Sequence, residues 1–140
     1  MNPYYEDDAV TIYHGDALEV LPTLPPVDLV ITSPPYNLGD MRGGYANLAG
    51  GYGEHSDMMP DAEYVAWQRS CLQMMWDALA DTGAIFYNHK PLIRDKMVLL
   101  PLRLNPGLPL RQIIIWDRNL GMNWSETHFV PNCEDRKSVV

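Results

Sequence analysis

The chain has 140 residues, of which 46% are hydrophobic and 20% are charged. This length and composition predict one globular domain with its own core, spanning residues 1–140. The formal net charge of −8 argues against a protein that grips nucleic-acid phosphates unaided. Because no N-terminal stretch is typical of a signal peptide and no apolar run has membrane-spanning length, we expect a cytoplasmic protein without membrane contact.

The cysteines and histidines indicate neither a disulfide framework nor a metal site. Cys71 and Cys133 are unlike either pattern, and Cys71 falls on a predicted helix, so a reduced protein is expected. The four histidines are scattered, without the spacing of zinc ligands: His14, His55, His89 and His128. We therefore expect no bound metal.

The first part of the chain predicts a strand–helix–strand unit. Residues 10–13 read as a strand, residues 16–21 as a short helix closed by Pro22, and residues 27–31 as a buried parallel strand. This order of elements is typical of a parallel sheet. We expect the strand that ends at Ile31 to be central in that sheet and to lie beside the first strand.

The run that follows, Thr32-Ser33-Pro34-Pro35-Tyr36-Asn37, is the most informative in the chain. Each proline lacks an N–H and forces the preceding residue to be extended, so the strand stops and Ser33 and Pro34 are stretched across its carboxyl end. Open α/β sheets bind ligands at that end. We therefore expect these side chains to line a crevice.

The polar atoms of this run could bind the amino group of a planar ring. The Ser33 hydroxyl and the Pro34 carbonyl are two acceptors, which fit the two N–H donors of an exocyclic amine of adenine or cytosine. Binding both hydrogens would turn the nitrogen lone pair towards an electrophile. Tyr36 offers a flat face on which a base turned out of a duplex could stack.

The segment 38–59 is rich in glycine and mostly polar, which predicts a flexible surface loop. The alternative is a lid over a bound base, because long loops directly after catalytic residues are often functional.

Residues 61–79 carry apolar and aromatic side chains at three- and four-residue spacing, which predicts a helix capped by Asp61 and stopped by Gly83. Residues 84–87 and 112–116 predict two further buried strands. The segment 92–104 is compatible with a helix broken by a proline.

Two polar pairs follow predicted strands. His89-Lys90 either faces the crevice or ends its strand in solvent, and Asp117-Arg118 favours an ion-paired strand end over a substrate contact.

Ser33-Pro34-Pro35-Tyr36 after an apolar strand resembles the catalytic motif of the amino-group DNA methyltransferases, which methylate adenine N6 or cytosine N4. Residues 13–18 resemble the Gly-Asp segment of that family, whose acid is implicated in binding S-adenosylmethionine. Trp67 and the segments 83–90 and 112–118 resemble later elements of the family in the same order. The resemblance runs from about residue 10 to residue 134, nearly the whole chain.

The resemblance implies an α/β protein with a Rossmann-like S-adenosylmethionine-dependent methyltransferase fold and a parallel-sheet core, here incomplete. It implies catalytic roles for Ser33, Pro34, Pro35 and Tyr36 and a cofactor contact at Asp16. The implied partner is double-stranded DNA with a flipped target base, as in restriction-modification systems. Within the family, serine at the position of Ser33 favours cytosine N4 as the target, but neither the target base nor the oligomeric state is decided.

The chain also departs from the family. We find no Phe-x-Gly-x-Gly segment, the glycine turn that lets backbone approach the cofactor, so we expect weak S-adenosylmethionine binding or none. Residues 135–140 include a polar run where family members continue with an apolar strand, so we interpret them as a non-native tail. Two alternatives to DNA methylation stay open. One is an inactive truncated fragment, and the other is a methyltransferase that acts on RNA or an amide.

Overall fold

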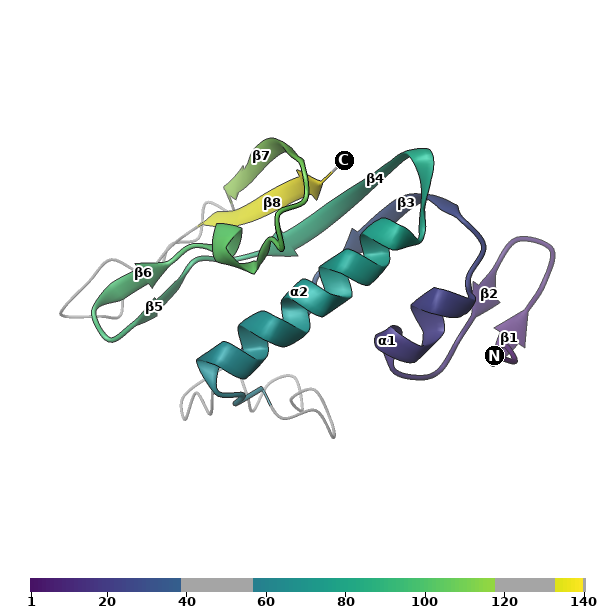
Figure 1. Ribbon diagram of the computed structural model, residues 1–140, viewed down its shortest axis with the longest axis horizontal. Coiled ribbons are helices and arrows are strands. Elements are labelled where there is room, and N and C mark those ends of the chain that lie inside the picture. Colours follow the sequence, from purple (N-terminus) through teal and green to yellow (C-terminus); the bar gives the residue numbers. More distant parts are fainter. Residues whose placement is uncertain (39–56, 118–132, 140) are drawn as a thin grey trace.

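The computed structural model describes residues 1–38, 57–117 and 133–139 (Figure 1). In chain order the elements are β1 (Tyr5–Glu6), β2 (Thr11–Ile12), α1 (Ala17–Val20), the 3-10 helix η1 (Leu21–Thr23), β3 (Val27–Thr32), α2 (Asp61–Asp77), β4 (Leu79–His89), β5 (Leu92–Arg94), β6 (Met97–Leu99), the 3-10 helix η2 (Pro101–Leu104), β7 (Leu110–Asp117) and β8 (Cys133–Val139).

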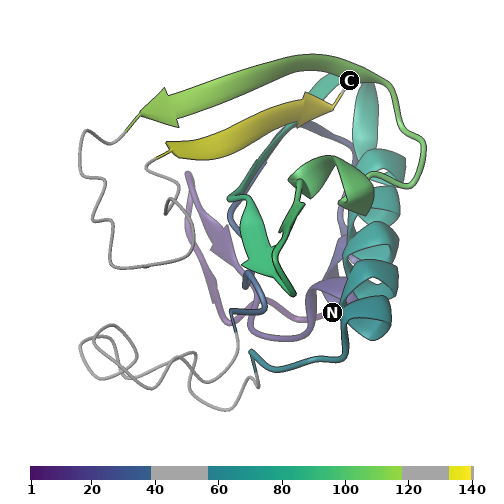
Figure 2. The same ribbon diagram turned by 90° about the vertical axis from the view of Figure 1, so that its left-hand side faces the viewer.

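The main sheet has four strands in the order β3-β4-β8-β7 (Figure 2). β3 and β4 are parallel, and β8 runs antiparallel to both of its neighbours. Two separate antiparallel ribbons accompany the sheet, β1 with β2 and β5 with β6. The core of the fold is therefore a mixed sheet that contains one parallel pair, β3 and β4.

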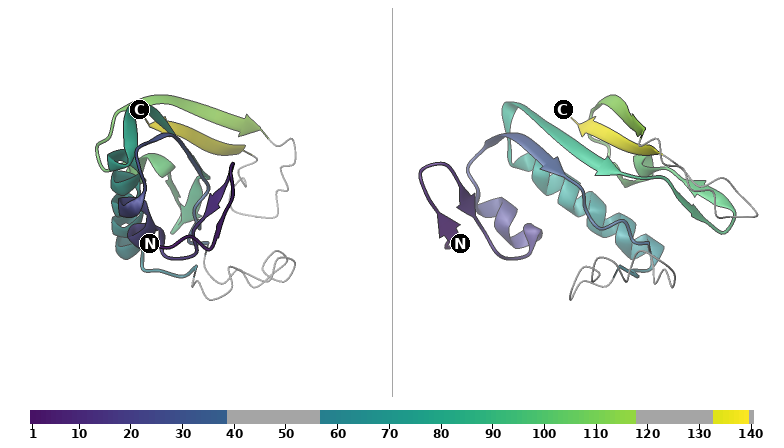
Figure 3. Two further views of the ribbon diagram at one scale, coloured as in Figure 1. Left: turned by 90° about the vertical axis from the view of Figure 1, so that its right-hand side faces the viewer. Right: turned by 180° about the vertical axis from the view of Figure 1, so that it is seen from behind.

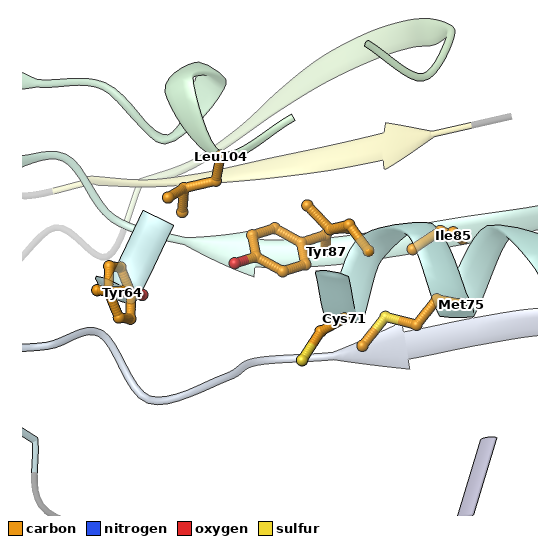
Figure 4. Close-up of a cluster of buried hydrophobic side chains, with 7 residues drawn as sticks. Tyr64, Cys71, Met75, Ile85, Tyr87 and Leu104 are labelled. Atoms are coloured by element: carbon orange, nitrogen blue, oxygen red, sulfur yellow. The ribbon is translucent and has the colours of Figure 1, made fainter. Parts of the chain in front are cut away.

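The long helix α2 packs along one face of this sheet. Ile85 and Tyr87 of β4 are fully buried and lie against Cys71 and Met75 of α2 (Figure 4). Because side chains alternate across a strand, Phe86 and the residue after Tyr87 belong to the opposite face. The spacing of apolar residues that predicted α2 thus corresponds to its core-facing side.

The expected pairing of the strand at residues 10–13 with β3 is wrong. Only Thr11–Ile12 forms a strand in that region, and it pairs with β1 beside α1 rather than with β3 (Figures 1 and 3). The cause is local, because the carboxylate of Asp7 accepts from the backbone N–H groups of Ala9 and Val10 and closes a tight turn between the two short strands.

The expected central position of β3 is also wrong, because within the described ranges β3 is an edge strand of the sheet. Its side chains Leu29 and Ile31 are 50% and 74% exposed on the face away from α2, whereas Val30 on the other face packs against the core.

The end signals predicted for α2 need correction. Pro60, not Asp61, is the N-cap, and proline has no side-chain acceptor that could cap the helix. The Asp61 carboxylate bonds Arg103. Gly83 does not stop the helix but lies inside β4. A Cβ there would come within 3.0 Å of the Val27 carbonyl oxygen, so glycine permits the close approach of β4 to β3.

The segment 92–104 is not a broken helix but the β5–β6 hairpin followed by η2. Asp95 and Lys96 both have positive φ, 50° and 63°, which is the backbone of a type I′ hairpin turn. Pro101 begins η2, at a position where its missing N–H costs nothing.

The predicted loop and the predicted non-native tail both stay predictions. Residues 39–56 lie outside the described residues, so the predicted loop is described only at its ends. Residues 133–139 form β8, which lies between β4 and β7. The non-native origin that we predict for residues 135–140 concerns their source, and it stays a prediction.

Candidate active site

Three polar side chains meet at the carboxyl ends of β3 and β4. The Ser33 Oγ and Tyr36 Oη atoms are 2.7 Å apart, and the Asn88 amide nitrogen donates to both, at 3.1 Å and 2.7 Å. Asn88 reaches Ser33 because the β3–β4 register pairs Thr32 with Tyr87, so the next residues lie opposite each other. The structure therefore confirms that the strand ends directly before Ser33 and the two prolines, and it adds a partner from β4.

The hydroxyl hydrogens decide what this triangle can bind. Ser33 has one hydrogen and two lone pairs, and the Asn88 amide uses one lone pair. If Ser33 donates its hydrogen to the Tyr36 oxygen, its second lone pair is left to accept an N–H from a ligand. If Tyr36 donates instead, both lone pairs are used. Ser33 can accept an amine hydrogen only in the first arrangement.

A cavity of about 370 Å³ opens beside these groups on the sheet face away from α2. Its lining combines the polar triangle with apolar side chains of three strands: Ile31, Thr32, Ser33, Tyr36, Phe86, Asn88 and Trp116. Such a mixed lining suits a flat ring that carries a polar edge. The predicted crevice thus exists although β3 is an edge strand, because β4 and β7 supply its other wall.

A side chain of α2 binds the backbone carbonyl of the second proline. The Tyr64 hydroxyl donates to the Pro35 carbonyl at 2.8 Å and lies 2.7 Å from the Nε2 atom of His89. Tyr64 and His89 are only 1% and 2% exposed. The Pro34 carbonyl accepts no hydrogen bond from the described residues, so it keeps its acceptor capacity. Of the two interpretations of His89, the solvated strand end is wrong.

The Tyr36 ring has neighbours of its own. Its centroid lies 4.7 Å from that of the His89 ring, with 43° between the planes. The Lys90 ammonium lies over the ring, 5.7 Å from its centroid. Both contacts come from the end of β4, which sets the direction of the ring.

Asn37, directly after the motif, anchors the ends of the loop predicted over residues 38–59. It is 1% exposed and has a φ of 56°. Its side chain bonds the backbone N–H and C=O of Met59, and the Asp57 carboxylate accepts from the backbone N–H groups of Asn37 and Leu38. An asparagine tolerates this left-handed conformation better than most residues.

A charged cluster ties the same region to the first turn of α2. Arg103 donates two hydrogen bonds to the Asp61 carboxylate, and Arg94 lies 3.5 Å from it. These bonds hold the pKa of Asp61 below its usual value. Arg94 also donates to the backbone carbonyl of Asn37. Burial, assisted by the charge of Asp57, raises the pKa of the Tyr64 hydroxyl, so that group stays protonated and able to donate.

Asp16, the predicted cofactor contact, lies elsewhere. It is exposed and caps α1, since its Oδ1 atom accepts from the Leu18 N–H at 2.8 Å. It does not line the cavity beside Ser33. Its assigned role therefore stays a prediction.

Sequence reasoning missed the roles of Asn88, Tyr64 and Asn37. The strand alternation from Tyr87 offered a signal for Asn88, whereas the contacts of Tyr64 depend on how α2 docks. Within the described ranges, no group of three or more acidic, histidine or cysteine side chains could hold a metal. None of the helices in those ranges is long and apolar enough to cross a membrane. Arg118 lies outside the described residues, so the pair Asp117-Arg118 is not placed.

The chain is similar in sequence to known DNA methyltransferases. A family model described as DNA methylase matches residues 27–135. The chain is 31% identical over 139 residues to the Type II methyltransferase M.ScaI of Streptomyces caespitosus, covering 94% of this chain and 41% of that protein. It is 31% identical over 121 residues to the Type II methyltransferase M.BglII of Bacillus subtilis, covering 80% of this chain and 30% of that protein. The chain thus spans less than half the length of these relatives.

A solved structure supports the fold class. The chain aligns with a protein of Thermus thermophilus, assigned as a DNA modification methylase and complexed with S-adenosyl-L-methionine. The TM-score is 0.51 at 23% identity, and the alignment covers 89% of this chain and 52% of the other. The predicted α/β, Rossmann-like methyltransferase fold is confirmed.

Proposed function

This chain belongs to the DNA methylase family matched over residues 27–135, and on that premise we propose that it provides the base-amine site of a site-specific DNA methyltransferase. The reaction is methyl transfer to the exocyclic amine of adenine (N6) or cytosine (N4) in double-stranded DNA, as in restriction-modification systems. The observation that carries the proposal is the hydrogen-bonded group of Ser33, Tyr36 and Asn88 beside the cavity.

The site acts by holding the amine. The Ser33 hydroxyl and the Pro34 carbonyl accept its two hydrogens, while the Tyr64 bond keeps the Pro35 carbonyl turned away. An amine held in this way directs its lone pair towards the incoming methyl carbon. The nitrogen–carbon bond would form as the carbon–sulfur bond of the donor breaks, with its electron pair left on sulfur, and the amine would then release one hydrogen as a proton to water. Fixed acceptors contribute because they need no reorganisation as charge develops on the nitrogen. Asn88 supports this by fixing the Ser33 hydroxyl.

The methyl donor implied for this family is S-adenosylmethionine, which supplies an electrophilic methyl group when bound. Among the described residues, the exposed Asp16 carboxylate fits it, because a carboxylate accepts hydrogen bonds from hydroxyl or amine donors. We propose that Asp16 holds the donor through such a bond.

We propose that the target base leaves the duplex to reach this site, because Ser33 can bond the amine only from inside the cavity. We propose that the Tyr36 ring, which also lies against His89, stacks on the base. The apolar side chains of Ile31, Phe86 and Trp116 line the remainder of the cavity.

The test is methyl transfer to duplex DNA by the purified chain, with labelled S-adenosylmethionine in large excess because weak binding is expected. We expect label in N6-methyladenine or N4-methylcytosine, and a fall in turnover of about 10²-fold or more in Ser33→Ala. DNA affinity should change little, because phosphate contacts dominate it. Ser70→Ala, which removes an exposed hydroxyl on α2, is the matched control.

Tyr36→Ala should act differently, because it removes stacking worth roughly 1–3 kcal/mol. The fluorescence of 2-aminopurine at the target position should decrease in Tyr36→Ala and persist in Ser33→Ala, with Tyr5→Ala as control. Full turnover in Ser33→Ala would refute the mechanism. Absence of label would favour the inactive fragment, and label in RNA or an amide would favour the other alternative.

A further inference from the structure

We infer that Tyr64 and His89 are positioning residues of the base-amine site, which fix the Pro35–Tyr36 peptide and the direction of the Tyr36 ring. Neither belongs to the motif that the resemblance implicates. The consequence for catalysis rests on the proposed function, whereas the arrangement itself follows from hydrogen bonds and ring contacts alone.

The first line of evidence is a buried junction of three segments. The Tyr64 hydroxyl, from α2, lies 2.8 Å from the Pro35 carbonyl oxygen and 2.7 Å from His89 Nε2, from the end of β4. Both side chains are almost completely buried. A hydrogen bond out of contact with water is costly to lose, because the group left behind has no substitute partner. The junction therefore holds the Pro35 peptide in one orientation.

The second line of evidence is how the His89 ring is held. Its Nδ1 atom lies 2.7 Å from the Lys90 carbonyl, which can only accept, so Nδ1 carries a hydrogen. The ring stacks nearly parallel on Tyr87, with 8° between the planes and 6.1 Å between the centroids. The imidazole is thus fixed in its plane and in rotation, and it forms a firm support for the Tyr36 ring at 4.7 Å.

The third line of evidence is a count of hydrogens. Tyr64 has one hydroxyl hydrogen, and both the Pro35 carbonyl and a neutral Nε2 atom of His89 can accept it. One hydrogen shared between two acceptors couples them, so a change at His89 reaches the Pro35 carbonyl through Tyr64. This coupling joins β4, α2 and the motif in one hydrogen-bonded unit.

Removing only the Tyr64 hydroxyl tests the inference. Tyr64→Phe keeps the ring, which packs in the core, and Tyr5→Phe removes an exposed hydroxyl as the matched control. The first readout is the backbone amide signal of Tyr36 in ¹⁵N-labelled protein, because that nitrogen is bonded to the Pro35 carbonyl carbon. The second is the ¹⁵Nε2 signal of His89. We expect both to move in Tyr64→Phe and neither in Tyr5→Phe.

Variants at His89 provide the second arm. His89→Gln keeps a polar group near the former Nε2 position, whereas His89→Ala removes the ring and its support. We expect the Tyr36 amide signal to stay closer to wild type in His89→Gln than in His89→Ala. An unmoved Tyr36 amide in both Tyr64→Phe and His89→Ala would overturn the inference.

Kinetics separate this inference from the proposed function. With labelled S-adenosylmethionine and DNA, turnover in Tyr64→Phe should fall about 10-fold or more with KM for DNA unchanged, because misplacement affects the reacting geometry and not phosphate contacts. If the signals shift as expected but neither wild type nor any variant transfers methyl groups, the positioning role stands and the proposed function is refuted. If methyl groups are transferred but the signals do not shift, the proposed function stands and the positioning role is refuted.

Discussion

The pair Tyr87 and Gln68 tests how the core under the site tolerates polar groups. The Tyr87 hydroxyl donates to the Gln68 Oε1 atom at 2.5 Å, and the two residues are 0% and 1% exposed. The Gln68 amide nitrogen has no hydrogen-bond partner among the described residues. Gln68 is therefore half satisfied, and its remaining bond to Tyr87 decides whether the amide is tolerated.

The expected loss of unfolding free energy depends on which buried polar group is left without its hydrogen-bond partner. Tyr87→Phe leaves the Gln68 oxygen buried without its donor, so the free energy of unfolding should fall by about 1–3 kcal/mol. Gln68→Met keeps the length of the side chain but leaves the Tyr87 hydroxyl alone, with a similar loss. The double variant removes both groups, and also the amide nitrogen without a partner, so its stability should lie within about 1 kcal/mol of wild type.

Urea unfolding followed by tryptophan fluorescence would give the four free energies of this cycle. Tyr5→Phe, at an exposed tyrosine, is the control for the loss of a hydroxyl. A double variant as unstable as the sum of the two single variants would refute the reasoning, because it would mean that the two groups contribute independently.

Three further predictions concern titrating groups. Burial raises the pKa of the Cys71 thiol to about 11, so in a Cys133→Ser background Cys71 should react with a thiol reagent at pH 8 only when urea unfolds the chain. Burial also raises the pKa of Tyr64 and Tyr87 in the folded state, so unfolding releases their protons above about pH 10. The free energy of unfolding should then fall as pH rises, by up to about 1.4 kcal/mol per pH unit for each tyrosine, and less steeply in Tyr64→Phe. Asp61→Asn should destabilise by less than about 1 kcal/mol at pH 7, because the ion pair is half exposed, and the difference should vanish in unfolding curves as pH falls through the lowered pKa of Asp61.

Local signals in the sequence predicted the elements that carry the site. The apolar run before Thr32 and the spacing along α2 are periodic patterns, and the structure has a strand and a helix there. The prolines at 34 and 35 predicted the end of that strand for a steric reason that does not depend on the rest of the fold. These predictions are confirmed because their causes lie within a few residues.

The wrong predictions concern turns and strand pairings, which the periodic pattern of apolar residues does not report. The partner of β3 depends on which other strands are available to pair. The turn at Asp7 brings β1 next to β2, so β2 pairs with β1 and not with β3. The hairpin after His89 escaped notice because its turn residues, Asp95 and Lys96, include no glycine although both have positive φ. Strand alternation places Asn88 on the face opposite Tyr87, but its contact with Ser33 depends on the register, which sets the two residues opposite each other.

The edge position of β3 changes what holds the site together. A central strand would be fixed by hydrogen bonds on both sides, whereas β3 is fixed on one side, by β4. The strand end is instead secured beyond the sheet, where Asn88 holds Ser33 and Tyr36, and Tyr64 holds the Pro35 carbonyl. The cavity is therefore formed at the end of an edge strand. The preorganisation of the acceptors comes from side chains of β4 and α2, and not from a second neighbouring strand.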